Sequence, residues 1–263
     1  MLSTILILAT LTAEPIHQQS PSEITDYLYL LNAKGDTFEQ RVRKVTQDSL
    51  GTEYNDGPLG EGVGGKYDPD PIIDLTRVDC VTFVEQTVAL SMTPNYDEMV
   101  EFLQTIRYKD GKIDYEHRNH FMITDWLPNN PYCQDVSSQL GVETQTVKRT
   151  ISRKDFFQLV KAPTIGQSTP DQTISLNIIS VKDTAHAEKN LPDTALIIFI
   201  GKIDWLFSLH TGLYIRDENG RGQLIHASSK SGKVVSMNLT DYTESQKTRY
   251  LGFTAYKITE PPM

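Results

Sequence analysis

The sequence predicts an α+β fold in which a helical part precedes an antiparallel sheet. Residues 21–161 carry helix caps and apolar residues at helical spacing, residues 162–193 are polar and irregular, and residues 194–258 contain strand-like runs. Helices followed by strands, without regular alternation of the two, are typical of α+β domains. With 263 residues, the chain has the length of one large domain or two small ones, and we expect a single domain over residues 21–263.

Caps and terminators define the first two helices. Ser22 is placed to cap a helix over residues 23–33, and Gly35 to end it. Thr37-Phe38-Glu39-Gln40 has the spacing of a capping box, and Gly51 is placed to end the helix that follows. Two short helices are therefore expected before residue 51.

A long loop should separate these helices from the next pair. Residues 51–77 are rich in Gly, Pro and Asp, and loops of this length inside a domain are usually functional or disordered. A third helix should then start at Cys80, since apolar residues form a stripe along one face at Val81, Val84 and Val88. Asp97 is placed to cap a fourth helix that reaches Tyr108.

After Pro192 the pattern changes to strands. Five apolar or alternating runs are separated by turn signals such as Glu218-Asn219-Gly220, and they cover residues 195–200, 209–215, 224–227, 234–237 and 250–258. Residues 162–193 should form an irregular insertion, either as an inserted lobe or as a cover over a cleft.

Charge and composition exclude some partners. The chain has a net charge of −9 and a sequence pI of about 5.2, with 38% hydrophobic and 22% charged residues. It can therefore bury a core, and neither nucleic acid nor an anionic membrane surface is expected as its main partner. We expect a monomer.

The N-terminal residues resemble the apolar core of a secretory signal peptide. Residues 1–13 carry no charged side chain, and this run is shorter than the roughly 20 residues that span a bilayer. We therefore expect residues 1–20 to be a leader and the protein to be exported to the periplasm or the medium. A buried N-terminal strand is the alternative, because no Lys or Arg precedes the apolar run.

The chain has two cysteines, Cys80 and Cys133. A pair in an exported protein can form a disulfide, and sequence alone does not fix pairing. We expect two free thiols, because Cys80 begins a helix and Cys133 lies in the turn-like segment Asn129-Asn130-Pro131-Tyr132-Cys133-Gln134-Asp135.

Cys80, His210 and His226 together have the residue types of a cysteine hydrolase. A thiol at a helix N-terminus, next to an imidazolium, should have a lowered pKa and form the reactive thiolate. His210 would act as base and acid, His226 would orient its ring, and backbone N–H groups at the helix start would stabilise the oxyanion. Taken alone, a cysteine at a helix start is more often a small buried residue.

No cofactor or catalytic metal is expected. The sequence contains no HExxH and no CxxC, and its histidines are scattered.

Several segments resemble those of papain-like NlpC-type cell-wall cysteine hydrolases, and more closely the N-acetylmuramoyl-L-alanine-amidase-like family. The resemblance runs from about residue 50 to residue 258. It is carried by Leu50-Gly51-Thr52-Glu53-Tyr54, Asp79-Cys80-Val81-Thr82-Phe83-Val84-Glu85, Ile106-Arg107-Tyr108-Lys109-Asp110-Gly111, Arg118-Asn119-His120-Phe121 with Asp125-Trp126, His210-Thr211-Gly212-Leu213-Tyr214 and His226-Ala227-Ser228-Ser229.

The resemblance implies a helical lobe packed on an antiparallel sheet, and hydrolysis of an amide in peptidoglycan or its fragments. It implies Cys80 as nucleophile, His210 as base and His226 as third member. Tyr54 matches a tyrosine that lines such sites, and Asp79 matches an acidic residue that holds a substrate amine. For Tyr54 the alternative is plain packing, and for Asp79 it is a helix cap.

His120, Asp125 and Trp126 are the remaining substrate-binding candidates. They would line the groove with Arg118, or they would brace the helical part. The chain departs from the broad superfamily at Val81-Thr82, where Ser-Gly is usual, and at Trp205-Leu206-Phe207-Ser208 before the base.

The sequence thus predicts a cysteine amidase of peptidoglycan or muropeptides that cleaves the lactyl–L-alanine amide through a thioester. A stem-peptide endopeptidase of the same fold is the near alternative. A non-catalytic muropeptide-binding protein and an acyltransferase are the alternatives from other classes.

Overall fold

The first two helices form where local capping signals stand. The computed structural model describes residues 14–167, 170–204, 206–217 and 219–260, and in it α1 (Pro21–Ala33) and α2 (Phe38–Asp48) each begin with a capping box. Thr37 caps α2 as predicted. The cap of α1 is Ser20 and not Ser22, because the Ser20 backbone N–H donates to the Glu23 carboxylate at 2.7 Å and the Ser20 side chain accepts from the Glu23 N–H.

The folded part begins before the expected boundary at residue 20. The signal-peptide prediction for residues 1–13 lies outside the described residues. Ile16, in the short 3-10 turn η1 (Ile16–Gln18), is 2% exposed and belongs to the main apolar core. Ile16 and the capping Ser20 are therefore part of the domain. No helix in the described part of the chain is long and apolar enough to cross a membrane.

The third helix, α3 (Cys80–Met92), is the centre of the helical part. From Thr82 to Met92 every residue is buried, and α3 packs against α2, α4 (Tyr96–Arg107) and three strands of the sheet. The start of α3 at Cys80 confirms the prediction. The cap of α4 is Asn95 and not Asp97, because the Asn95 side chain accepts from the Glu98 N–H at 3.0 Å.

The long loop is held at both ends by strands that the sequence did not reveal. The two-residue strands β1 (Glu53–Tyr54) and β2 (Arg77–Val78) pair in parallel, with Tyr54 opposite Val78. This pairing closes the loop and brings Tyr54 to the segment that leads into Cys80.

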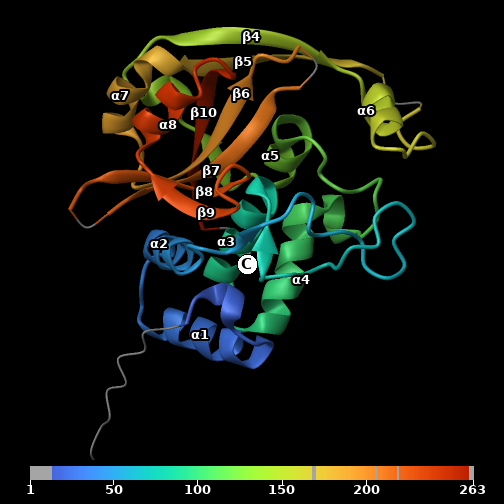
Figure 1. The fold of residues 1–263 in the computed structure, drawn as a ribbon, viewed down its shortest axis with the longest axis vertical. Coiled ribbons are helices and arrows are strands. Elements are labelled where there is room, and N and C mark those ends of the chain that lie inside the picture. The colour runs from blue at the N-terminus through green and yellow to red at the C-terminus, as the bar shows by residue number, and fades with distance from the viewer. Residues whose placement is uncertain (1–13, 168–169, 205, 218, 261–263) are drawn as a thin grey trace, which may run out of the picture.

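The C-terminal half forms a large, mostly antiparallel sheet above the helices (Figure 1). In the described residues its order is β2-β1-β9-β8-β7-β6-β10-β5-β4, and β3 (Cys133–Asp135) pairs with β10. The five predicted strands are confirmed, at β6 (Thr194–Gly201), β7 (Ser208–Arg216), β8 (Gly222–Ser228), β9 (Lys233–Met237) and β10 (Tyr250–Ile258). The mixed α+β prediction is therefore correct.

The structure differs from the expectation for residues 162–193. Instead of an irregular insertion, this segment contains the nine-residue strand β5 (Gln172–Ser180), which pairs along its length with β4 (Thr144–Ile151). Ile174, Leu176 and Ile178 alternate with polar residues, which is the pattern of a strand with one exposed face. Because β4 and β3 lie before residue 161, the N-terminal part is not purely helical either.

Short helices complete the fold. On the helical side these are η2 (Lys109–Gly111), the π-helical turn η3 (Met122–Trp126), α5 (Leu127–Asn129) and η4 (Ser137–Gln139). The helix α6 (Arg153–Leu159) follows β4, and η5 (Val181–Asp183), α7 (Thr184–Ala187) and η6 (Glu188–Asn190) follow β5. The last, α8 (Leu239–Ser245), lies between β9 and β10.

Candidate active site

Cys80 is held at the first position of α3 by its neighbour Asp79. The Asp79 Oδ1 accepts hydrogen bonds from the N–H groups of Val81 at 2.9 Å and Thr82 at 2.7 Å, and the Thr82 hydroxyl accepts from the Asp79 N–H at 2.8 Å. Cys80 is half-buried, and both it and Cys133 are free thiols, as predicted. The helix start therefore presents the Cys80 sulfur without a bridge.

A bulge on β7 sets the position of His210. His210 lies opposite Phe199 of β6, whereas Ser208 lies opposite Ile200, so Leu209 is an extra residue on β7. A Cβ on Gly201 would stand 2.0 Å from the Leu209 side chain, so only glycine leaves room for it. Bulges next to active sites commonly redirect a side chain, and this one immediately precedes His210.

The rings of His210 and His226 are joined by a hydrogen bond. The His210 Nε2 lies 2.7 Å from the His226 Nδ1, and the two rings are nearly perpendicular, at 85°. Gly212 makes this approach possible, because a Cβ there would lie 2.8 Å from the His226 Cβ and 2.9 Å from the Ile225 carbonyl oxygen. The glycine two residues after His210 thus has a physical role in the pair.

With this hydrogen bond in place, one tautomer of His210 can act as a base. If His210 carries its proton on Nε2 and donates it to His226 Nδ1, its own Nδ1 is left unprotonated and can act as a base. The reverse tautomer would protonate Nδ1 and remove that capacity. The His226 Nε2 is buried and has no hydrogen-bond partner among the described residues.

Three aromatic residues pack behind the histidines. Phe199 stacks on His210 with ring centroids 5.9 Å apart, and Tyr242 lies 4.8 Å from the His226 ring. The hydroxyls of Tyr242 and Tyr250 are hydrogen-bonded at 3.0 Å, and Tyr250 stacks on Phe199 at 5.2 Å. This shell excludes water from the inner side of both rings. In the sequence these three residues look like ordinary core positions of two strands and a short helix, so the shell could not be predicted.

The electrostatics of the site differ from the expectation of a ready thiolate. Burial, and then the Asp79 carboxylate, raise the pKa of the Cys80 thiol, and only the backbone amides of Thr211 and Cys80 oppose them. Burial lowers the pKa of His210 well below its usual range, and His226 and Arg249 lower it further. Burial also lowers the pKa of His226, to about 4. These shifts favour a neutral thiol and neutral imidazoles at pH 7, in contrast to the lowered thiol pKa expected from the helix N-terminus.

The same contacts connect α3 to the histidine strand. The Thr211 backbone, which lowers the pKa of the Cys80 thiol, belongs to the residue after His210. Since α3 packs on both β7 and β8, the fold brings the helix start to the strands that carry His210 and His226.

Tyr54 and Asp79 are two further predicted site residues whose surroundings involve Cys80. Burial raises the pKa of Tyr54 to about 12, and Asp56, Cys80 and Asp79 add to the effect, so Tyr54 stands within the field of the thiol. Asp79 serves as the helix cap, and its Oδ2 also accepts from the Gly57 N–H at 3.3 Å. Most of its acceptor capacity is used within the protein.

His120, Asp125 and Trp126 are occupied by structural contacts. The His120 Nε2–H donates to the Tyr115 carbonyl at 2.7 Å, and the ring packs edge-on against Phe157. Asp125 forms an ion pair with Arg153. Trp126 is fully buried, with its Nε1 donating to Glu85 at 3.0 Å, so substrate cannot reach its ring. These placements fit the bracing alternative, and they correct the expectation that Trp126 lines a groove.

A buried ion pair that the sequence analysis missed lies along α3. Glu85 and Arg107 are 3.6 Å apart, with side chains 5% and 4% exposed. Burial raises the pKa of Glu85 to about 7, although Arg107 opposes this. The pair joins α3 to α4 beneath the Cys80 end of the helix.

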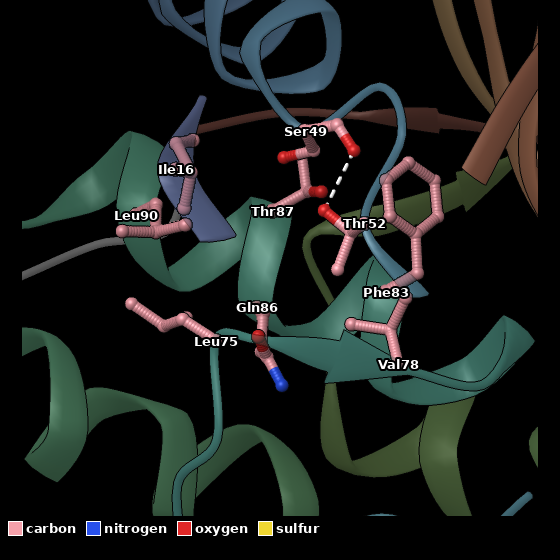
Figure 2. Close-up of a pocket in the computed structure, with 9 residues that line it drawn as sticks. All are labelled: Ile16, Ser49, Thr52, Leu75, Val78, Phe83, Gln86, Thr87 and Leu90. Atoms are coloured by element: carbon pink, nitrogen blue, oxygen red, sulfur yellow. Dashed lines mark hydrogen bonds between the residues drawn. The ribbon is translucent and has the colours of Figure 1, made fainter. Parts of the chain in front are cut away.

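Two cavities lie elsewhere. One, of about 10 Å³, is enclosed between η1, the end of α2 and α3, where Thr52 donates to the Ser49 carbonyl at 2.7 Å (Figure 2). It has the size of a single water molecule. The other, of about 570 Å³, lies between the loop at Glu61–Tyr67 and residues 113–116 and 164–165. Neither is lined by Cys80, His210 or His226.

Comparisons with known proteins show which family and which folds this chain is similar to. A family model described as "AmiA-like: N-acetylmuramoyl-L-alanine amidase-like" matches residues 44–251. The crystal structure of a protein from Legionella pneumophila str. Philadelphia 1 is similar with a TM-score of 0.84 at 23% identity, over 94% of this chain and 97% of that one. The crystal structure of an N-acetylmuramoyl-L-alanine amidase from Bacteroides uniformis ATCC 8492 is similar with a TM-score of 0.65 at 23% identity, and the match covers 84% of this chain and 99% of that one. No curated protein matches the sequence.

Proposed function

The chain belongs to the N-acetylmuramoyl-L-alanine amidase-like family, and on this premise we propose that it is a cysteine-dependent amidase of papain-like, NlpC-type fold. Its substrate would be peptidoglycan or muropeptides, and the bond cleaved would be the lactyl–L-alanine amide. The observation that carries the proposal is the 2.7 Å contact between His210 Nε2 and His226 Nδ1 on strands packed against the Cys80 helix. An imidazole oriented by a second group, next to a thiol, is the arrangement of a cysteine acyl-transfer site.

Attack on the amide would begin from a neutral Cys80 thiol and a neutral His210 imidazole. The Cys80 proton passes to His210 Nδ1 as the sulfur forms a bond to the amide carbonyl carbon. His210 then gives this proton to the alanine nitrogen as the C–N bond breaks. A thioester and a free peptide result. Water, losing its proton to His210, then cleaves the thioester and restores the thiol.

One backbone group is well placed for the oxyanion. Asp79 already takes the N–H groups of Val81 and Thr82, and its carbonyl accepts from the Phe83 N–H at 3.0 Å. The Cys80 N–H is the remaining amide at the start of α3, next to the attacking sulfur. We assign it as an oxyanion donor. Removing one such donor typically lowers the rate by a factor of about 10²–10³.

Asp79 favours the amidase over the endopeptidase alternative. An endopeptidase that acts on free stem peptides needs an acceptor for the N-terminal amine of its substrate. The Asp79 carboxylate already accepts the hydrogen bonds that cap α3 and one from the Gly57 N–H. An amidase substrate has no free amine at this position, because that nitrogen is part of the scissile bond.

The family also supports a location outside the cytoplasm, where peptidoglycan is found. We propose that the protein acts there.

The product masses test the function. N-Acetylmuramoyl-L-alanyl-D-isoglutamine should yield N-acetylmuramic acid and the dipeptide L-alanyl-D-isoglutamine, at a rate that EDTA leaves unchanged. Release of isoglutamine alone would indicate an endopeptidase. Binding without any product would favour the non-catalytic alternative, and product formed only with an added amine or hydroxyl acceptor would indicate acyl transfer.

A further inference from the structure

A buried arginine holds the turn that leads into the strand of His210. Arg149 lies on β4 and is 7% exposed, and its guanidinium donates from Nη2 to the Gly201 carbonyl at 2.6 Å and from Nη1 to the Leu206 carbonyl. Gly201 ends β6, and Leu206 comes two residues before β7 begins. One side chain, 52 and 57 positions earlier in the sequence, therefore links the two ends of this turn.

The contacts of Arg149 fall on a segment where the sequence departs from the broad superfamily, at residues 205–208. The guanidinium carbon lies over the Phe207 ring, 5.4 Å from its centroid. The Phe207 carbonyl in turn accepts from the Gly201 N–H at 3.0 Å, which closes the base of the turn. The unusual lead-in to the proposed base thus has its own partner on β4.

The chemistry of the guanidinium suits the task of fixing a turn. Within the described part of the chain, the side-chain hydrogen bonds of Arg149 go to these two neutral carbonyls. Burial of a charged group is unfavourable unless hydrogen bonds satisfy it, and bonds from a charged donor are stronger than neutral ones. Because the donors form a rigid planar fork, they hold both acceptors at a fixed separation. Arg149 therefore sets the width of the turn.

This width matters because the strand register changes inside the hairpin. Ser208 lies opposite Ile200 on the turn side, whereas His210 lies opposite Phe199 beyond it, and Leu209 is the extra residue between them. A shift of one residue in a strand turns its side chains to the other face of the sheet. If the turn opened, the bulge would no longer be held at this position, and the shift would pass into the strand that carries the base.

We propose that Arg149 is a positioning residue for His210. By linking the two ends of the turn, it keeps the bulge at Leu209 and the His210 ring on His226. The inference rests on the proposed amidase function, in which His210 moves the proton. Since the hydrogen bond to His226 selects the tautomer of His210 that can act as a base, loss of the turn would disable the site without removing any residue from it.

Kinetics of three variants test the inference. Arg149→Met keeps an unbranched apolar stem and removes the donors. Its kcat on N-acetylmuramoyl-L-alanyl-D-isoglutamine should fall about 10- to 100-fold with KM unchanged, because a small misplacement of a catalytic group can lower the rate about 10²-fold. Arg149→Lys should fall between this variant and the wild type, since an ammonium lacks the planar fork.

The matched control is Arg216→Met, at the other end of β7. The Arg216 Nη2 also donates to backbone carbonyls, those of Glu188 at 3.1 Å and Leu191 at 3.3 Å, and its guanidinium lies over the Tyr214 ring. Arg216→Met should therefore lose similar contacts but keep the wild-type kcat. Equal falls of kcat in Arg149→Met and Arg216→Met would overturn the inference, because they would show a general loss of strand stability.

Imidazole nitrogen-15 spectra give a readout that a loss of stability alone does not move. At a temperature where both proteins are fully folded, His210 should show one tautomer in the wild type, protonated at Nε2, and signals averaged between two tautomers in Arg149→Met. An Arg149→Met protein with the wild-type kcat, or with a single His210 tautomer, would overturn the inference and leave the amidase function standing.

The spectra also separate this inference from the proposed function. If the wild type cleaves no muropeptide, the proposed function fails and the spectra alone decide: tautomers that mix only in Arg149→Met support the role of Arg149, and an unchanged spectrum rejects it. If Arg149→Met does not fold, Arg149→Lys replaces it. A lowered kcat with mixed tautomers in Arg149→Lys would then support the inference, and wild-type values would overturn it.

Discussion

The side chains of His210 and His226 form a hydrogen bond, with His210 Nε2 2.7 Å from His226 Nδ1, although the two residues are 16 positions apart in the chain. They occupy neighbouring antiparallel strands, β7 and β8, whose turn brings the two residues together. His226 is 3% exposed, so its ring is fixed in place, and the half-buried His210 lies on the strand that packs against the Cys80 helix.

Removal of the His226 ring should lower kcat without unfolding the protein. His226→Ala leaves His210 free to rotate and to adopt the wrong tautomer, and we expect a fall of roughly 10²–10⁴-fold, the range of general acid–base catalysis. His226→Gln should recover part of the rate, because its amide oxygen can accept from His210 Nε2. His186→Ala, at an exposed histidine of α7, is the matched control. Steady-state kinetics on a muropeptide measure all three, and a His226→Ala protein as fast as the wild type would remove His226 from the site.

Gly212 should not tolerate a methyl group. Gly212→Ala places a Cβ 2.8 Å from the His226 Cβ, so β7 and β8 must separate there. We expect a loss of about 1–3 kcal/mol in the free energy of unfolding, as for other overpacked cores, and a fall in kcat. Gly64→Ala is the control, since a Cβ at Gly64 meets nothing within 4 Å. Urea denaturation checks the prediction, and an unchanged midpoint for Gly212→Ala would contradict it.

The Cys80 thiol should be slow to alkylate at neutral pH. Because burial and Asp79 raise its pKa above the ordinary value of 9.0, the rate of labelling by iodoacetamide should still be rising above pH 9. Asp79→Asn keeps a good helix cap but removes the charge, so its labelling profile should move to lower pH. Peptide mass spectrometry separates Cys80 from Cys133. A labelling plateau for Cys80 between pH 5 and about 7 would indicate the preformed thiolate of other cysteine hydrolases instead.

Breaking the buried ion pair of α3 and α4 should cost much more than neutralising it. Glu85→Ala leaves the Arg107 guanidinium buried without its carboxylate, and the loss in the free energy of unfolding should be about 3–5 kcal/mol. Glu85→Gln retains an acceptor for the Trp126 Nε1 and should lose less. Equal losses in the two variants would show that the charge is irrelevant.

The burial of Glu85 should also make the free energy of unfolding depend on pH. Glu85 has a folded-state pKa of about 7, raised from 4.5 by burial, so its contribution to stability is complete below pH 4.5 and is lost as the pH rises through 7. Relative to Glu85→Gln, the wild type should therefore lose stability between these values. Unfolding midpoints of the two proteins at pH 4.5 and pH 8 measure the difference, and a constant difference would contradict it.

The sequence predicts best what is determined locally. The capping boxes at Thr37 and Asp79 are set by residues three positions apart, and α2 and α3 begin at these caps. The strands that carry His210 and His226 are continuous apolar runs, so they could be placed as well. By contrast β5 was missed, because every second residue in it is polar and the strand is recognisable only through its alternation.

The surroundings of the site could not be predicted, because distant segments supply them. Tyr242 lies on a short helix and Tyr250 begins a strand, and each reads as ordinary core until the fold brings it against Phe199. Trp126 belongs to a family-like segment, yet its indole points inward to Glu85. The raised pKa of the Cys80 thiol is unpredictable for a similar reason, because the helix N-terminus is visible in the sequence but the burial of the thiol is not.

Cysteine dependence is the central claim, and turnover of a defined muropeptide by two matched variants tests it most directly. Cys80→Ala should release no L-alanyl peptide above the uncatalysed level, whereas Cys133→Ala, which removes the other free thiol, should keep the wild-type rate. Undiminished release by Cys80→Ala would contradict the account, since the amide would then be cleaved by other groups.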